Sequence, residues 1–167
     1  MKQVQKRIRY GVAVLSLALL APSATASAAD DVRAVLDTVQ GLFDAMATRD
    51  ADAARAVLLP EGRLIVVARG DDGALTTRPW DHTDFAAGLE GEGPVLLERV
   101  WDPEVRIEGD LAAYRAAYDF HRDGAYSHCG VDLFQLVRLA DGWRISGGSF
   151  TRETTPCADN PLPPPGT

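Results

Sequence analysis

His128 and Asp132 lie four residues apart in a run whose alternation of apolar and polar residues predicts a β-strand. Side chains at that spacing share one face of a strand. In an apolar cavity, desolvation brings the pKa of a carboxylate close to neutrality, and the group can then take a proton from a weakly acidic C–H. Asp132 would orient His128, or either group would act as the base. The structural alternative is that Asp132 pairs with Arg138 or Arg152 near the rim.

Aromatic residues of the preceding extended run are the expected walls of such a cavity. Tyr114, Tyr118 and Phe120 alternate with polar residues, so all three share the face that we expect to point inward. The Tyr118 hydroxyl is a candidate hydrogen-bond donor to a ligand, and a candidate catalytic group beside His128 and Asp132. The alternative is that the rings only fill the core.

The register of the last predicted hairpin decides what else joins that face. A two-residue turn at Asp141-Gly142 places Trp143 beside Asp132 and Phe134, whereas a three-residue turn places it on the opposite face. The sequence leaves both registers open. We expect Phe134 and Trp143 to line the cavity or the core.

Glu98 and Arg99 are adjacent in another predicted strand, so one of them must face inward. A buried charge requires a partner. An inward Arg99 would bind the carboxylate of a ligand; a salt bridge at the rim is the alternative.

The motifs of several enzyme classes do not occur in the chain. It contains no G-x-S-x-G, P-loop, G-x-G-x-x-G or C-x-x-C sequence, and its three histidines have no recognisable metal-ligand spacing. We therefore expect neither a cofactor nor a metal site.

The first 28 residues predict a signal peptide. A basic start and an apolar run over residues 11–21 precede Ala26-Ser27-Ala28, which fits the small-x-small cleavage rule. Cleavage removes four basic residues from a chain of net charge −7, which leaves −11. A domain with this negative charge is not expected to bind nucleic acid or an anionic membrane surface, because both are negatively charged. The predicted location is periplasmic or secreted.

Cys129 and Cys157 are the only cysteines, and in an exported chain they predict one disulfide. The last predicted hairpin brings residues 151–155 opposite Cys129, so the pairing is geometrically reasonable.

Helix signals precede a long antiparallel set of strands. Asp30 or Asp31 is the expected N-cap of a first helix that ends near Thr48, and Asp50 is expected to cap a second helix that Pro60 and Gly62 close. A third short helix is expected over residues 84–89, capped by Thr83. Extended runs are predicted over 64–68, 74–78, 95–101, 104–108 and three runs between 112 and 157, with turns at 122–124 and 140–142.

This order predicts an α+β fold in which one curved sheet wraps around the first helix and leaves a pocket at its open end. We expect one domain over residues 29–157, followed by a disordered proline-rich tail over 158–167.

The chain resembles the nuclear transport factor 2-like superfamily from about Asp30 to Cys157, within it the exported polyketide-cyclase-like (SnoaL-like) and "putative lumazine-binding" groups. The segments that carry the resemblance are Phe43-Asp44-Ala45-Met46, Arg49-Asp50, Tyr118-Asp119-Phe120, Asp123-Gly124, Ser127-His128-Cys129-Gly130-Val131-Asp132, Phe134-Gln135-Leu136-Val137, Asp141-Gly142-Trp143-Arg144-Ile145, Thr151-Arg152 and Cys157. The resemblance implies a cone-shaped, cystatin-like fold, with a curved antiparallel sheet packed on a long N-terminal helix around a cavity. It also implies a homodimer through the outer face of the sheet.

The resemblance does not fix a reaction, because members include both enzymes and binding modules. Our leading hypothesis is an exported domain that binds a small apolar or aromatic molecule. The alternatives are a cofactor-free isomerase, cyclase or dehydratase, and a non-catalytic dimeric interaction protein. A cavity of several hundred Å³ reached by a carboxylate or histidine would favour the enzyme.

Overall fold

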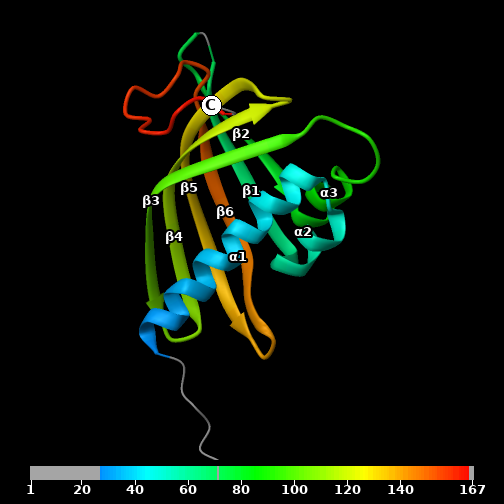
Figure 1. Cartoon of the computed structure of the whole chain (residues 1–167), viewed down its shortest axis with the longest axis vertical. Helices are drawn as coiled ribbons and strands as arrows, with labels where there is room; N and C mark the ends of the chain where they lie inside the picture. Colours follow the sequence, from blue (N-terminus) through cyan, green and yellow to red (C-terminus); the bar gives the residue numbers. More distant parts are fainter. Residues whose placement is uncertain (1–26, 71, 166–167) are drawn as a thin grey trace, which may run out of the picture.

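The computed structural model describes residues 27–70 and 72–165, so the predicted signal peptide lies almost entirely outside the described residues. Three helices and six strands form an α+β domain in which the long first helix lies across the hollow of a strongly curved sheet (Figure 1). The predicted fold class is therefore confirmed. Among the described residues, no helix is long and apolar enough to cross a bilayer.

The first helix, α1 (Ala28–Thr48), begins at Ser27 and not at the predicted Asp30 or Asp31. The Ser27 hydroxyl accepts a hydrogen bond from the Asp30 backbone N–H, and the Asp30 carboxylate accepts one from the Ser27 backbone N–H. This capping box satisfies two backbone donors at the helix start. Asp30 is thus the third residue of the helix. Arg49 ends the helix in the left-handed conformation, with φ of 56°.

Two short helices flank the sheet beside α1. The predicted helix α2 (Ala51–Val57) is capped by the Asp50 side chain, as expected. Helix α3 (His82–Ala87) begins after Asp81, two residues earlier than the sequence indicated. Both cover the sheet next to the C-terminal end of α1 (Figure 1).

The six strands form one sheet in the order β2-β1-β6-β5-β4-β3, and only the β1–β6 pair is parallel. Their bounds are β1 (Leu58–Arg69), β2 (Leu75–Asp81), β3 (Leu96–Glu108), β4 (Leu111–Arg122), β5 (Ala125–Leu139) and β6 (Gly142–Arg152). Successive side chains along each strand point alternately to the inner and the outer side of the curved sheet.

Two prolines that were expected to end elements lie inside strands. β1 begins at Leu58 and continues through Pro60, because its pairing with β6 skips the residues between Leu58 and Arg63. β3 continues through Pro103, because its pairing with β4 shifts between Trp101 and Glu104. A proline lacks the N–H that a ladder needs, and an irregularity of this kind accommodates it.

The last hairpin adopts the register that groups Trp143 with Asp132. Leu139 pairs with Gly142 and Arg138 pairs with Trp143, so two residues form the turn. Trp143 is buried together with Phe134 and Asp132. The sequence had left this choice open.

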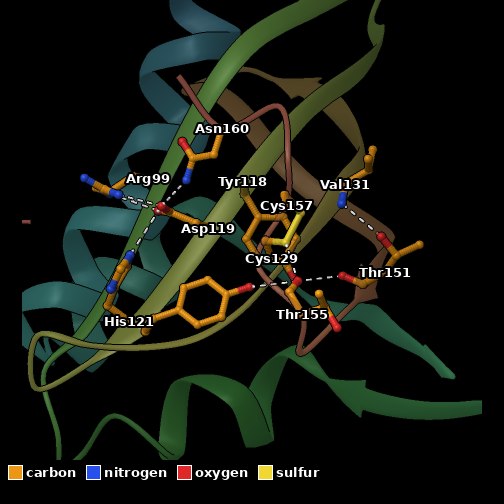
Figure 2. Close-up of a disulfide and its surroundings, with 11 residues drawn as sticks. Arg99, Tyr118, Asp119, His121, Cys129, Val131, Thr151, Thr155, Cys157 and Asn160 are labelled. Atoms are coloured by element: carbon orange, nitrogen blue, oxygen red, sulfur yellow. Dashed lines mark hydrogen bonds and ion pairs between the residues drawn. A yellow bond between two sulfur atoms is a disulfide. The ribbon is translucent and has the colours of Figure 1, made fainter. Parts of the chain in front are cut away.

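The outer face of the sheet carries the C-terminal segment (residues 153–165), which a disulfide holds in place (Figure 2). Cys129 on β5 is bonded to Cys157, as the cysteine count predicted, and the Cys129 and Glu153 backbones exchange two hydrogen bonds. Further along, the Asn160 amide donates to the Asp119 carboxylate at 2.6 Å. The sequence predicted a disordered tail over residues 158–167, whereas Asn160 in this segment contacts and covers Asp119 on β4.

The disulfide is expected to contribute about 3–4 kcal/mol to stability, because the cross-link joins residues 28 apart in sequence. The variant Cys157→Ser should lower the free energy of unfolding by about that amount in denaturant titrations without reductant. Reductant should bring the parent close to the variant and leave the variant unchanged. Equal stability of the two proteins without reductant would contradict a stabilising bond.

Candidate functional site

A cavity of about 590 Å³ lies between α1 and the inner face of the sheet. Helices α1 and α3 and all six strands contribute side chains, because the sheet curves around the space that the helices do not fill. Most of the lining is apolar or aromatic: Leu42, Phe43, Met46, Leu64, Val66, Ala68, Trp80, Phe85, Leu96, Phe120, Phe134 and Phe150.

Two carboxyl groups face each other in this cavity. Asp132 on β5 is buried, with 1% of its surface exposed, and its carboxyl lies close enough to that of Glu98 on β3 for a hydrogen bond when one of the two is protonated. A hydrogen bond between two carboxyl groups requires a proton on one of them. The second carboxylate oxygen of Asp132, Oδ2, has no hydrogen-bond partner among the described residues.

Both carboxyl groups have raised pKa values. Burial is the largest cause of the raised pKa of Asp132, and burial followed by the charge of Asp132 raises the pKa of Glu98 well above its ordinary range. Like charges in contact disfavour the doubly ionised state, so the pair titrates as a unit and retains a proton to higher pH than isolated carboxyls do. One group can donate a hydrogen bond while the other accepts one.

His128 lines the same cavity but does not touch Asp132. Its ring stacks on Phe120 at 4.8 Å between centroids, and its Nδ1 lies 3.0 Å from the Ser127 hydroxyl. Burial, and then the positive charge of Arg152, lower the pKa of His128 to about 4, so the ring is neutral at neutral pH. The predicted pairing of His128 with Asp132 is thus absent, since Asp132 reaches across the sheet to Glu98 instead.

Three other predicted site residues belong to the packed core and do not line the cavity. The Tyr118 hydroxyl donates to the Thr151 carbonyl at 2.7 Å, so it cannot also donate to a ligand as expected. The Tyr114 ring stacks on Phe134 at 5.8 Å, and Trp143 lies under the Arg138 guanidinium at 4.4 Å. Phe120 and Phe134 do line the cavity as predicted.

Arg99 faces away from the cavity, so the alternative of a salt bridge is confirmed and the inward, ligand-binding arginine is wrong. Its guanidinium forms an ion pair with Asp119 on the outer face (Figure 2). It also donates to the Pro163 carbonyl. His121 Nε2 also lies 3.3 Å from Asp119. Burial alone would raise the pKa of Asp119, but hydrogen bonds from Arg99, Asn160 and His121 lower it, so this carboxylate stays ionised.

The sequence showed that one of two neighbouring residues must face inward, but the role of an inward Glu98 was not considered. Alternation requires either Glu98 or Arg99 to face inward, and Glu98 does. The deciding partner, Asp132, lies 34 positions later on a strand two places away in the sheet. Three arginines also line the cavity: Arg78, Arg122 and Arg152. Because they are far apart in the sequence, no local pattern groups them.

Comparison with known proteins gives a family. Residues 30–151 match the model of the family described as "Putative lumazine-binding". The comparison with curated proteins found no match.

Solved structures agree with the fold. A protein from Kribbella flavida is 19% identical, with a TM-score of 0.58 over 76% of this chain and 93% of that one. A nuclear transport factor 2-like protein with a cystatin-like fold from Novosphingobium aromaticivorans is 16% identical, with a TM-score of 0.59 over 78% and 86% of the two chains. A protein described as a "putative dehydratase" of the same superfamily, from Streptomyces avermitilis, is 14% identical, with a TM-score of 0.54 over 76% and 99%.

At these identities the structural likeness shows the fold alone. The family model, however, covers well over half of the chain and agrees with the cone-shaped sheet, the long first helix and the cavity between them. The chain therefore belongs to the "Putative lumazine-binding" family, and it has the cystatin-like fold of nuclear transport factor 2-like proteins.

Proposed function

We propose that this protein binds a small, largely apolar molecule in the cavity between α1 and the sheet. The observation that carries the proposal is a cavity of about 590 Å³ with predominantly apolar walls and a few polar groups. Ligand sites are commonly of this size and composition. The family description, which names a heteroaromatic ligand, supports a small-molecule role in general terms.

A second candidate function is acid–base catalysis, and the pairing of Glu98 with Asp132 favours it specifically. An ionised carboxyl of the pair would take a proton from a C–H of the bound molecule, and its protonated neighbour would give one to an oxygen. In an isomerisation the two transfers leave the proton count of the pair unchanged. In a dehydration the protonated oxygen leaves as water. Two carboxyl groups line the cavity, and a cavity reached by such groups favours an enzyme.

Export and self-association are further proposals. A disulfide between Cys129 and Cys157 is compatible with an oxidising compartment. Cleavage after Ala28 would remove Ser27, the N-cap of α1, but would retain Asp31, whose carboxylate pairs with Arg138 on β5 at 2.7 Å. A homodimer through the outer sheet face is the quaternary state that the resemblance implies.

Filling the cavity should abolish binding without unfolding the protein. Ala68 lines the cavity on β1 and is only half-buried, so the variant Ala68→Trp should place an indole in the open space. We expect the affinity for the neutral fluorescent probe N-phenyl-1-naphthylamine to fall about tenfold or more, a loss of at least ~1.4 kcal/mol. The control is Ala113→Trp, an exposed position on the outer face of β4. Absence of probe binding to the parent would contradict the proposal.

Removing one charge from the pair should stabilise the protein at high pH. The folded pKa of Glu98 is raised, so the parent loses stability as the pH rises from the unfolded pKa near 4 through the folded pKa. The variant Glu98→Gln lacks this loss. Its stability advantage over the parent should grow, by at most ~1.4 kcal/mol per pH unit, as the pH rises above about 4.

Thermal or denaturant unfolding across this pH range measures the effect. The matched control is Glu61→Gln, an exposed carboxyl on β1, which should give a profile parallel to that of the parent. A pH-independent difference between Glu98→Gln and the parent would contradict a shared proton.

Export is tested by the mass of the protein recovered from the cell envelope or the medium. We expect a chain that begins at Ala29, and we expect Ala28→Phe to block processing because the cleavage rule needs a small residue there. Recovery of the parent with residues 1–28 still attached would contradict the proposed export route.

A further inference from the structure

Three arginines surround the opening of the cavity. Arg78 on β2, Arg122 on β4 and Arg152 on β6 line it, and all three are exposed, whereas Asp132, Phe85 and Leu64 line it as buried residues. The strands bring them to one end of the sheet. Arg152 pairs with Ala68, Arg78 with Val66 and Arg122 with Leu96, each of which also lines the cavity.

Among the described residues, these arginines have no acidic partner. Seven of the other arginines in the described residues form ion pairs with Asp or Glu, and Arg49 and Arg69 donate to backbone carbonyls. Only four described arginines have neither an ion pair nor a side-chain hydrogen bond, and Arg78, Arg122 and Arg152 are three of them. Arg78 lies over the Trp80 ring at 5.9 Å, which is a contact with a cavity wall and not with an acid. In a chain with 24 acidic residues, the lack of an ion pair at all three arginines needs an explanation.

The polar groups of the cavity are separated by depth. Asp132, which lies beside Glu98, is almost completely buried, the aromatic side chains form the walls, and the guanidinium groups are at the exposed end. An anion at the buried end would face a carboxyl pair, whereas an anion at the exposed end would face three guanidinium groups. A guanidinium binds carboxylate, sulfonate or phosphate through two parallel N–H donors.

We propose that the ligand is an amphipathic organic anion, whose aromatic or aliphatic body fills the cavity and whose acidic group binds Arg78, Arg122 and Arg152 at the opening. The inference rests on the proposed binding function and narrows its ligand class. The local positive charge also explains how an acidic protein attracts an anion to this one site, since charges that line a cleft focus the field there.

Two probes that share an aryl-naphthylamine body separate the two proposals. 1-Anilinonaphthalene-8-sulfonate carries an anionic group, whereas N-phenyl-1-naphthylamine is uncharged. We expect both to bind the intact, disulfide-bonded protein at one site and to displace each other. The anionic probe should bind about tenfold more tightly at about 50 mM salt, and this preference should shrink at about 500 mM salt because salt screens exposed charges.

Charge removal at the opening should act on the anionic probe alone. The triple variant Arg78→Gln, Arg122→Gln and Arg152→Gln is expected to weaken binding of the sulfonate about tenfold or more and to change binding of the neutral probe about twofold at most. The matched control removes three exposed arginines that do not line the cavity, in Arg33→Gln, Arg63→Gln and Arg106→Gln. It should leave both affinities within about twofold of the parent.

The outcomes are distinct. If neither probe binds the parent, the binding function fails and the ligand class fails with it. If the neutral probe binds but the sulfonate has no advantage, or if both triple variants weaken the sulfonate equally, the cavity binds ligands but the arginine opening does not select anions.

Discussion

The alternation of β3 determines the chemistry on both sides of the sheet. Glu98 faces inward, where its carboxyl lies beside that of Asp132, while Arg99, the next residue, faces outward and forms an ion pair with Asp119. The inward contact gives the cavity two carboxyl groups whose pKa values are raised. The outward contact neutralises a buried carboxylate that also receives the Asn160 amide, and so attaches the C-terminal segment. A shift of one residue in β3 would exchange the two faces and remove both arrangements.

The second constraint is the limited width of α1. Val35, Val39 and Leu42 are buried on one face of this helix, but a single helix covers only part of a curved six-stranded sheet. Tyr114 and Trp143 pack against the sheet at one end, and the other end stays hollow. An unfilled cavity and a buried carboxyl pair both reduce stability. The disulfide and the contacts of the C-terminal segment offset part of that cost, which is consistent with a cavity retained for function.

Much of this arrangement follows from local sequence, and the rest depends on pairings between distant segments. Turn residues at 122–124 and 140–142 predicted the meander, and alternation predicted that Phe120 and Phe134 face inward. The cysteine count predicted the disulfide. The choice between Glu98 and Arg99 could not be made locally, because Asp132 and Asp119 decide it from other strands. Alternation predicted that Tyr118 faces inward and lines the cavity. Its hydrogen bond to the Thr151 carbonyl could not be predicted, because Thr151 lies on β6, two strands away in the sheet.

The titration of the Glu98 and Asp132 side chains, followed by ¹³C NMR of their carboxyl carbons, tests the central claim most directly. The shared proton predicts two coupled steps, with at least one carboxyl remaining protonated well above the ordinary range of about 3.9 to 4.3. Two independent titrations within that ordinary range would mean that the two groups are separated and hydrated. Such a result would contradict the acid–base pair and the inward orientation of Glu98 on β3 that creates it.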